Sequence, residues 1–323
     1  MTARPDAAAS LSQRRPEFDV QILPPDISDW IEGNIGLPGF STFTGPEPGP
    51  HVALIALTHG NEIAGAILLD RMLRQAVRPA RGRLTFGFAN LDAFDRFDPL
   101  RPTASRFVDE DLNRVWDRDV LDGGRNTCEL ARARLLRPLI DSVDVLLDLH
   151  SMLWPSDPLM LCGGTEKGRQ FAVSLDAPDL VVADHGHVSG RRLIDYGPFS
   201  DPDTHQVANL IEAGQHWQPD TIAMAETVTR SVLHRTGLID EPPQVSSAGH
   251  RVAEVTHVIT AATACFAFVR SFRGADVVDR RNTLIAMDGA TEIRTPYDDC
   301  LLVMPSLRPS RGHTTVRLAR FAA

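Results

Sequence analysis

Two histidines and one glutamate are the residues whose types and spacing most clearly suggest chemistry. His59 and Glu62 lie three positions apart in the segment HGNE, and His150 directly follows a later apolar segment. Two imidazoles and one carboxylate can bind a zinc ion and leave its fourth position open, which is typical of catalytic zinc sites. Either histidine alone could instead be a hydrogen-bonded residue at a strand end. Because both end apolar segments, we predict one zinc ion per chain on these three residues.

Glu212 is a candidate general base. It lies in the segment IEAG at 211–214, between apolar neighbours and just before a glycine. A carboxylate in such a segment is costly unless it is paired, hydrogen-bonded or functional. A general base that takes a proton from an attacking water molecule needs this partly desolvated position. The alternative is a structural ion pair, with Arg106 or His216 as the partner.

A charged segment at 105–116 could recognise the substrate. It contains Arg106, and eight positions later the adjacent pair Asn113 and Arg114. A guanidinium can pair with both oxygens of a carboxylate, and a neighbouring amide adds a donor. Arg106 could polarise a scissile carbonyl group next to the zinc ion. A solvated charged loop is the ordinary alternative.

The elements that must position these residues follow from the hydrophobic pattern. Residues 52–57 are a continuous apolar run, as expected of a strand that is buried on both faces. Residues 143–149 (VDVLLDL) predict another buried strand. Apolar residues recur at helical spacing over 62–75 and 221–235. Such alternation predicts an α/β fold with a mostly parallel or mixed central sheet flanked by helices. In this fold the carboxyl ends of the strands meet at one crevice, where ligands bind.

The overall composition restricts the function further. The chain has 323 residues, which is the length of about two domains, and its net charge of −9 argues against a nucleic-acid or cationic membrane surface. Four scattered cysteines suggest neither disulfides nor a thiolate zinc site. The chain contains no apolar run of about 18 residues and no signal peptide pattern. We expect a cytoplasmic protein whose partner is a small molecule, and a homo-oligomer is compatible with the sequence.

Four motifs together resemble the aspartoacylase/succinylglutamate desuccinylase family, a branch of the zinc carboxypeptidase-like hydrolases. They are HGNE at 59–62, RFVDEDLNR at 106–114, LDLHS at 147–151 and IEAG at 211–214. The resemblance covers roughly 50–235. It implies zinc binding by the two histidines and Glu62, and it implies that Glu212 is the general base. It also implies that Arg106 stabilises the carbonyl oxyanion, and that Asn113 and Arg114 hold the substrate's α-carboxylate.

The resemblance also bears on the domains. Beyond a linker at 241–249, the runs are short and rich in β-branched residues. We therefore divide the chain into a flexible N-terminal tail at 1–17, a zinc-hydrolase α/β domain at 18–240, and a small all-β domain at 250–323. In the family, the C-terminal β domain overhangs the active site.

One position departs from the family pattern. Aspartoacylase has an arginine shortly before the general base, which grips the side-chain carboxylate of aspartate, whereas this chain has no arginine between Asp195 and Glu212. Arg191, Arg192 or His205 could replace it. A tyrosine of the C-terminal domain also contributes in the family, and Tyr297 is the candidate here.

These observations predict zinc-dependent hydrolysis of the amide bond of an N-acyl amino acid, such as an N-acyl-aspartate or N-acyl-glutamate. The products would be a carboxylate and a free amino acid. Two alternatives stay open. One is a zinc carboxypeptidase that acts on short peptides. The depth of the pocket distinguishes the two enzymes, because a β domain that caps the site would exclude polypeptides. The other is a non-catalytic relative that only binds a ligand.

Overall fold

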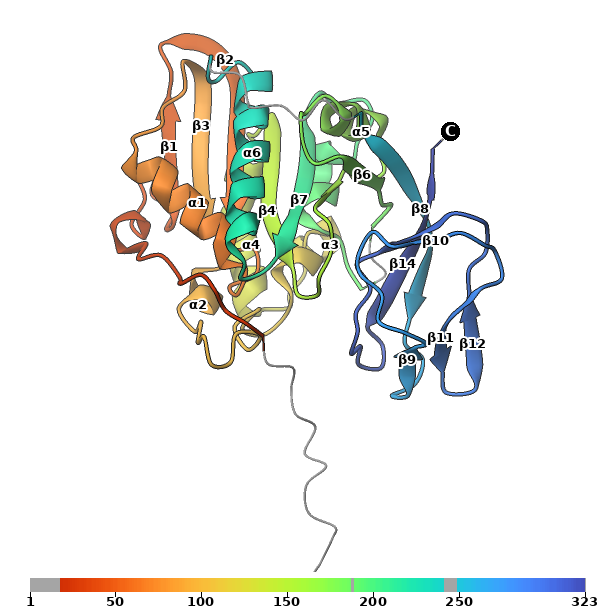
Figure 1. Cartoon of the computed structure of the whole chain (residues 1–323). Helices are drawn as coiled ribbons and strands as arrows, with labels where there is room; N and C mark the ends of the chain where they lie inside the picture. The colour runs from red at the N-terminus through yellow and green to blue at the C-terminus, as the bar shows by residue number, and fades with distance from the viewer. Residues whose placement is uncertain (1–17, 187–188, 241–248, 323) are drawn as a thin grey trace, which may run out of the picture.

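The fold is built on one large mixed sheet. The computed structural model describes residues 18–186, 189–240 and 249–322, so the predicted tail at 1–17 lies outside the described residues. Within them, the large sheet contains eleven strands (Figure 1). In spatial order these are β1 (Phe40–Thr44), β3 (Arg81–Phe88), β2 (Glu47–Ala56), β4 (Val145–Met152), β7 (Val207–Gln215), β5 (Leu159–Leu161), β6 (Leu180–Ala183), β8 (Arg251–Thr260), β14 (Thr314–Phe321), β13 (Cys300–Val303) and β10 (Val277–Val278).

The centre of this sheet is parallel and buried on both faces. Strand β2 pairs in parallel with β3 and β4, and β4 pairs in parallel with β7. Successive side chains of a strand point to opposite faces, so Leu54 belongs to one hydrophobic core and Ile55 to the other. This explains why the apolar run at 52–57 is continuous rather than alternating. The predicted α/β fold with a mixed sheet is confirmed.

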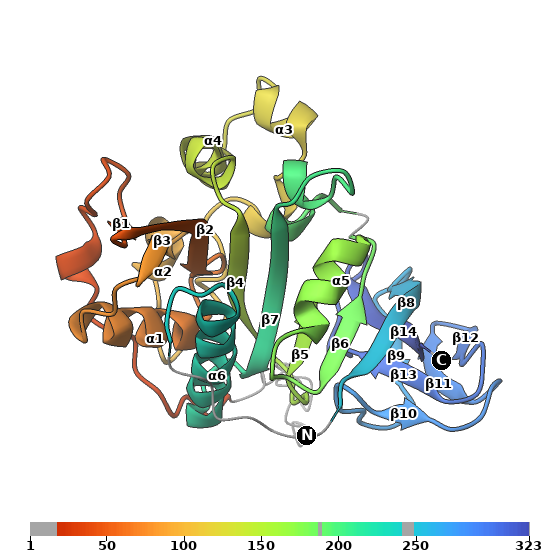
Figure 2. The ribbon, with the colours of Figure 1, turned by 90° about the horizontal axis from the view of Figure 1, so that it is seen from above.

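Helices cover both faces of the sheet. Helices α1 (Ile63–Arg74) and α6 (Pro219–Arg235) lie on one face, and α4 (Cys128–Ile140) lies on the other (Figure 2). None of the helices in the described residues has the length and apolar character needed to cross a bilayer. The remaining helical segments are α2 (Leu91–Phe94), α3 (Arg118–Asp122), α5 (Glu166–Val173) and the 3-10 turns η1 (Ser28–Trp30), η2 (Leu112–Arg114), η3 (Leu193–Asp195) and η4 (Gly197–Phe199).

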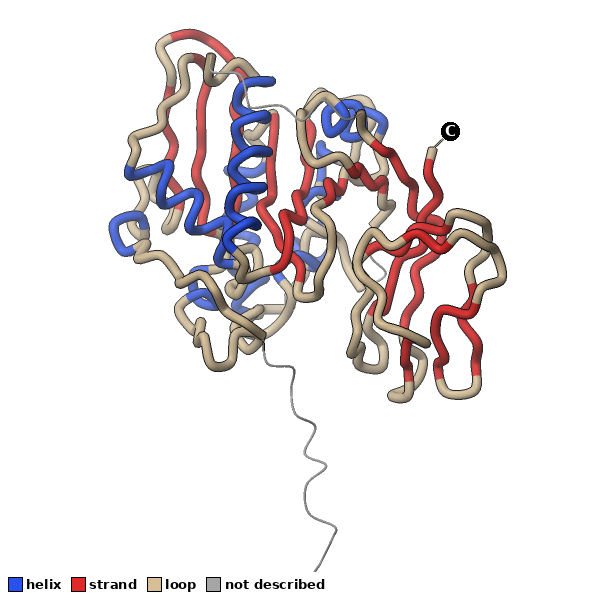
Figure 3. Tube along the Cα trace, viewed as in Figure 1, coloured by secondary structure: helices blue, strands red, loops and turns tan. Residues whose placement is uncertain are grey.

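The C-terminal part contains strands and turns over the described residues 249–322 (Figure 3). A small antiparallel sheet is formed by β9 (Phe266–Phe268), β11 (Leu284–Asp288) and β12 (Thr291–Arg294). The other C-terminal strands extend the large sheet, because β8 pairs in parallel with β6, and β14 then pairs with β8. The C-terminal strands are thus continuous with the sheet that holds the catalytic candidates, and a domain boundary at 241–249 stays a prediction.

Candidate active site

The candidate site lies where the central strands end on one face of the large sheet. His150 of β4 and Glu212 of β7 are paired neighbours in parallel register, so both side chains project from the same face. His59 and Glu62 come from the turn between β2 and α1. Gly60 in this turn has no room for a side chain, because a Cβ there would lie 2.4 Å from the backbone of Ala93. The turn is therefore packed tightly against a neighbouring segment.

The three predicted metal ligands are close together and buried. One ligand atom from each of His59, Glu62 and His150 lies within 4.8 Å of the other two. The His59 Nδ1 is 2.7 Å from Glu62 Oε1, and the His150 Nδ1 is 3.0 Å from Glu62 Oε2. Both imidazoles thus turn the same ring nitrogen toward the central carboxylate. This donor set fits a zinc ion with an open fourth position.

The far side of each imidazole meets a second carboxylate. The His59 Nε2 is 2.9 Å from Asp111 Oδ1, and the His150 Nε2 is 2.9 Å from Asp148 Oδ2. Metal-binding histidines characteristically have such outer carboxylates, which fix the ring orientation. The contact of His150 with Asp148 is not aligned for hydrogen bonding, and both atoms are buried without a hydrogen-bond partner among the described residues. The metal-site interpretation rests on the opposite ring edges, where the Nδ1 atoms face the Glu62 carboxylate.

The charged groups in this cluster shift one another's pKa values. Burial raises the pKa of Glu62, but His59 and His150 outweigh it and hold that pKa well below its usual value. Burial lowers the pKa of His150, whereas Asp148 and Glu62 raise it well above its usual value. Histidine binds a metal ion in its deprotonated form, so a proton and a cation compete at His150 and zinc affinity should fall as the pH is lowered.

Glu212 has the properties of a buried proton acceptor. Its Oε2 atom is buried and has no hydrogen-bond partner among the described residues. Burial and the charge of Glu62 raise the pKa of Glu212 to about 8, and a cation bound beside it would lower that value. The suggested partner His216 lies instead 2.8 Å from the Ser151 hydroxyl. No ion pair of Glu212 with His216 or Arg106 occurs among the described residues.

Arg106 lies directly against the three ligands. Its Nη1 donates to Glu62 Oε1 at 3.2 Å, and its Nη2 lies 2.9 Å from the His59 Nε2. The same Nη2 donates to Asp111 at 3.3 Å. The side chain remains 36% exposed. The structure thus places a guanidinium both at the ligands and at the solvent-facing side of the site, where a substrate carbonyl could reach it.

Asn113 and Arg114 lie in η2, next to the segment that follows Gly190. The Asn113 Oδ1 accepts a hydrogen bond from the Leu193 backbone at 2.8 Å, which leaves the amide nitrogen as a donor. Arg114 donates to the Asn113 carbonyl at 2.6 Å. Gly190 has a φ of +143°, and a Cβ there would lie 2.1 Å from the Arg114 carbonyl oxygen. Glycine is required at this close approach.

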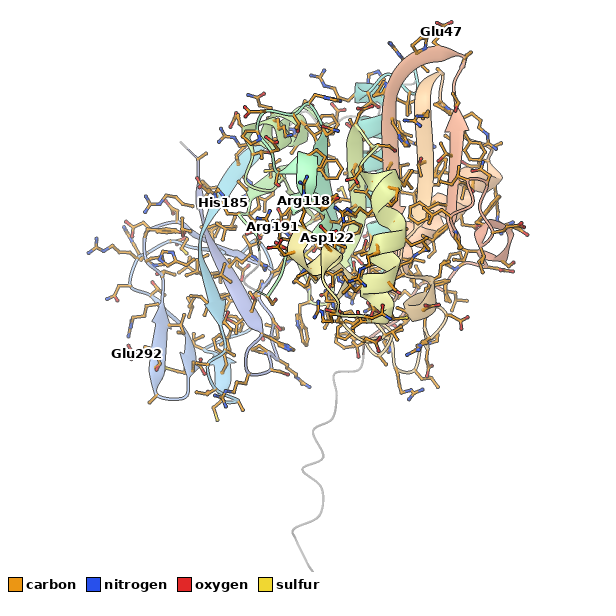
Figure 4. The ribbon with its side chains drawn as sticks, turned by 180° about the vertical axis from the view of Figure 1, so that it is seen from behind. Glu47, Arg118, Asp122, His185, Arg191 and Glu292 are labelled. Carbon is orange, nitrogen blue, oxygen red and sulfur yellow. The ribbon has the colours of Figure 1, made fainter. Side chains whose placement is uncertain are left out.

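The two arginines that were expected to replace the missing arginine are already engaged. Arg192 is buried and donates four hydrogen bonds to Asp184 and Asp195, at 2.6 to 3.1 Å. Arg191 is 56% exposed, lies beside α3 (Figure 4) and pairs with Asp117 at 3.0 Å. Neither contacts the three metal-ligand candidates or Glu212 in the described residues.

Tyr297 lies away from the site. Its hydroxyl is 2.6 Å from the Thr256 hydroxyl, and the Arg320 guanidinium lies 4.3 Å from its ring centroid. Tyr297 packs in a hydrophobic cluster with Leu318, whereas Ala319, the next residue of β14, belongs to the core on the other face of the sheet. The structure therefore does not bring Tyr297 to the candidate site.

Glu129 is a functional candidate that sequence reasoning missed. This fully buried carboxylate accepts hydrogen bonds from three consecutive backbone N–H groups at 108–110, at 2.6, 3.0 and 3.1 Å, and one from the Asn90 amide. It thereby fixes the backbone that leads to Asp111 and Arg114. We infer that Glu129 positions the substrate-binding segment without itself meeting the substrate.

The variant Glu129→Gln should destabilise the protein and lower its activity. An amide group has one acceptor oxygen, so its NH2 group would face two of the four donors. The expected loss in free energy of unfolding is about 1.5–3 kcal/mol, the range for hydrogen bonds to a charged group. Urea unfolding measures it. Glu166→Gln is the matched control, because Glu166 also lies in the first turn of a helix with a threonine N-cap, yet is exposed. Equal losses in both variants would contradict the positioning role.

One part of this chain is similar in sequence to known proteins. Residues 48–166 match the sequence model of the succinylglutamate desuccinylase/aspartoacylase catalytic domain. Aspartoacylase of Xenopus tropicalis is 31% identical over 115 residues, which cover 32% of this chain and 34% of that protein. A probable aspartoacylase of Parasynechococcus marenigrum is 36% identical over 107 residues, which cover 31% and 33%. The matched segment thus spans about one third of the length of these relatives.

Solved structures share the fold over most of the chain. Succinylglutamate desuccinylase from Vibrio parahaemolyticus superposes with a TM-score of 0.66 at 16% identity, and the match covers 88% of this chain and 87% of that one. The product-bound ectoine utilization protein EutE from Ruegeria pomeroyi has a TM-score of 0.62 at 17% identity, with coverages of 87% and 88%. His59, Glu62 and His150 lie within the matched segment 48–166, and Glu212 lies beyond it.

Proposed function

Because the chain belongs to the succinylglutamate desuccinylase/aspartoacylase family, we propose that it is a zinc-dependent hydrolase that cleaves the amide bond of an N-acyl amino acid. The observation that carries the proposal is the buried ligand set of His59, Glu62 and His150, with the unpartnered carboxylate of Glu212 on the adjacent strand. The substrate is a small N-acyl amino acid, and the products are a carboxylate and the free amino acid.

The proposed reaction needs a base and a proton donor, and Glu212 supplies both. Zinc held by His59, Glu62 and His150 would supply Lewis acidity, which lowers the pKa of water and polarises a carbonyl group. Glu212 takes a proton from the water that adds to the amide carbon. It then gives this proton to the amide nitrogen as the C–N bond breaks, so the amine leaves in neutral form. Burial of Glu212 favours this exchange, because its pKa is shifted toward neutral pH.

Arginine and amide donors orient the substrate in this proposal. Arg106 stabilises the oxygen of the tetrahedral intermediate, since its guanidinium lies at the ligand cluster and is still partly exposed. Arg114 and the Asn113 amide nitrogen bind the α-carboxylate of the amino acid half. The hydrogen bond from the Leu193 backbone to Asn113 fixes the amide in the orientation in which it donates.

A hydrolysis screen of the zinc-loaded full-length chain tests the proposal. The substrates are N-acetyl, N-succinyl and N-benzoyl amino acids, together with dipeptides, and release of the primary amine is measured. We expect hydrolysis of at least one N-acyl class, loss of that activity on chelation and recovery on addition of zinc. Failure to cleave any N-acyl amino acid would overturn the proposal. A clear preference for dipeptides would instead favour a carboxypeptidase.

A further inference from the structure

Arg317, in the last strand of the chain, faces the same side of the large sheet as the candidate active site. Ala319 of β14 shares a hydrophobic core with Ala208 and Leu210 of β7. Side chains two residues apart in a strand point to the same face, so Arg317 projects with Ala319 and Glu212 projects with Leu210. Arg317 is only 7% exposed. The C-terminal part thus delivers a buried cation to the catalytic face.

Arg317 retains free hydrogen-bonding capacity at this position. Its Nε lies 3.0 Å from Asp184 Oδ2 but makes no hydrogen bond, and it is buried. The same Asp184 oxygen already accepts a hydrogen bond from Arg192 at 2.9 Å. No hydrogen bond of the terminal nitrogens of Arg317 occurs among the described residues. Arg192 is saturated by its two aspartates, whereas Arg317 is not.

Arg114 is a second arginine whose hydrogen-bonding capacity is not used up. Its guanidinium has no carboxylate within ion-pair distance among the described residues. Burial lowers the pKa of Arg114 to about 10, with Arg106, Arg317 and Arg192 acting in the same direction against Asp111. Burial also lowers the pKa of Arg317, while Asp184 and Glu212 act against that shift. The contacts agree with these mutual effects. The Leu193 backbone donates to Asn113, next to Arg114. The adjacent Arg192 shares an Asp184 oxygen with Arg317, so Arg114 and Arg317 lie on either side of one segment.

Arg114 and Arg317 differ from Arg192 in how their donors are used. Arg192 makes hydrogen bonds to both Asp184 and Asp195. Among the described residues, Arg114 has no carboxylate within ion-pair distance, and Arg317 meets only an Asp184 oxygen that Arg192 already uses. A buried cation without a partner is costly, and the cost falls when an anion with matching geometry binds. One carboxylate group would supply acceptors for the unused donors of both side chains. Two guanidinium groups can donate to both of its oxygens, which is the geometry that arginine favours.

We propose that Arg317 and Arg114 together bind the α-carboxylate of the substrate's amino acid half, so that β14 contributes directly to the substrate site. This inference rests on the proposed function, which assigns the α-carboxylate to Arg114. It adds a residue from a segment about 200 positions away in sequence. It also gives the C-terminal strands a role in recognition without Tyr297, which faces the opposite side of the sheet.

Calorimetric titration of the zinc-loaded chain tests this inference, with Glu212→Gln as the background so that the ligand is not consumed. The probes are N-acetylglycine and N-acetylglycinamide, which differ only in the carboxylate. We expect Arg317→Gln and Arg114→Gln each to weaken binding of the acid by roughly tenfold or more, the effect of losing a charge-assisted hydrogen bond. Arg317→Lys should weaken it less. Binding of the amide should change little in every variant.

Arg320→Gln is the matched control, because Arg320 lies three residues further along β14, is exposed and points to the opposite face. This control should bind the acid as the parent does. Equal weakening for acid and amide in Arg317→Gln would show that Arg317 is only structural, and unchanged binding would also overturn the inference. The inference would also be overturned if the Glu212→Gln parent bound neither probe. Selective loss of acid binding in a chain that hydrolyses no N-acyl amino acid would support the subsite and refute the proposed function.

Discussion

Replacing Glu212 by glutamine is expected to reduce hydrolysis by on the order of 10²-fold or more, the range for loss of a general acid–base group. Glutamine keeps the size of the side chain, and the Oε2 atom that it replaces makes no hydrogen bond in the described residues. The fold should therefore be retained. The zinc ligands lie on other segments, so zinc content should also stay near one per chain. Turnover number, elemental analysis and thermal unfolding measure the three quantities.

The control for this prediction is Glu226→Gln. Glu226 lies on α6 and pairs with Arg71 and Arg230 at the surface, so its loss removes a carboxylate outside the site. Its effect on turnover should be small, since surface ion pairs contribute about 0–1 kcal/mol. If Glu212→Gln kept most of the turnover number, Glu212 would be a structural acid. A large loss of zinc in that variant would instead make Glu212 a metal ligand.

The central residues of the site were predictable because each one ends or follows an apolar segment. His59 and Glu62 follow the run at 52–57, and His150 follows the run at 143–149. Parallel strands bring their carboxyl ends to one edge, so the approximate position of the cluster follows from the fold class. Asp148 could have been found by the same reasoning. It lies two residues before His150, and alternate residues of a strand share a face.

Other parts of the site depend on packing that a sequence pattern does not reveal. Glu129 lies in the first turn of a helix, where an acidic residue is ordinarily explained by the helix dipole. Its four hydrogen bonds come from segments that reach it only in the folded chain. Arg192 could not be distinguished from a substrate-binding arginine, because its aspartate partners are recognisable only from the tertiary structure.

The pairing of the C-terminal strands is another feature that the sequence pattern did not reveal. Short runs rich in β-branched residues predicted strands over 250–323, but not their partners. Strand β8 adds to the edge of β6, so the large sheet continues into the C-terminal part. This pairing decides which side chains of β14 project from each face of the sheet. Arg317 lies on the face that holds the candidate site, and Arg320 lies on the face that holds Tyr297. The family resemblance suggested a tyrosine from this region, whereas the geometry favours an arginine.

Replacing His150 by alanine should cause a large loss of zinc, because it leaves only His59 and Glu62 at the metal. Two ligands bind zinc much more weakly than three. The comparison variant is Asp148→Asn, which keeps all three ligands and alters only the carboxylate next to the His150 Nε2. Loss of such an outer partner typically weakens metal affinity about 10–100-fold. We therefore expect His150→Ala to weaken zinc binding by more than Asp148→Asn does, and both to weaken it relative to the unaltered chain.

Competition titration against a chelator measures these affinities, and elemental analysis after dialysis measures the zinc retained. His205→Ala is the control, because His205 is an exposed histidine that pairs with Asp144 away from the three ligands. It should retain zinc as the unaltered chain does. One zinc ion per chain in His150→Ala after dialysis would show that the metal binds elsewhere.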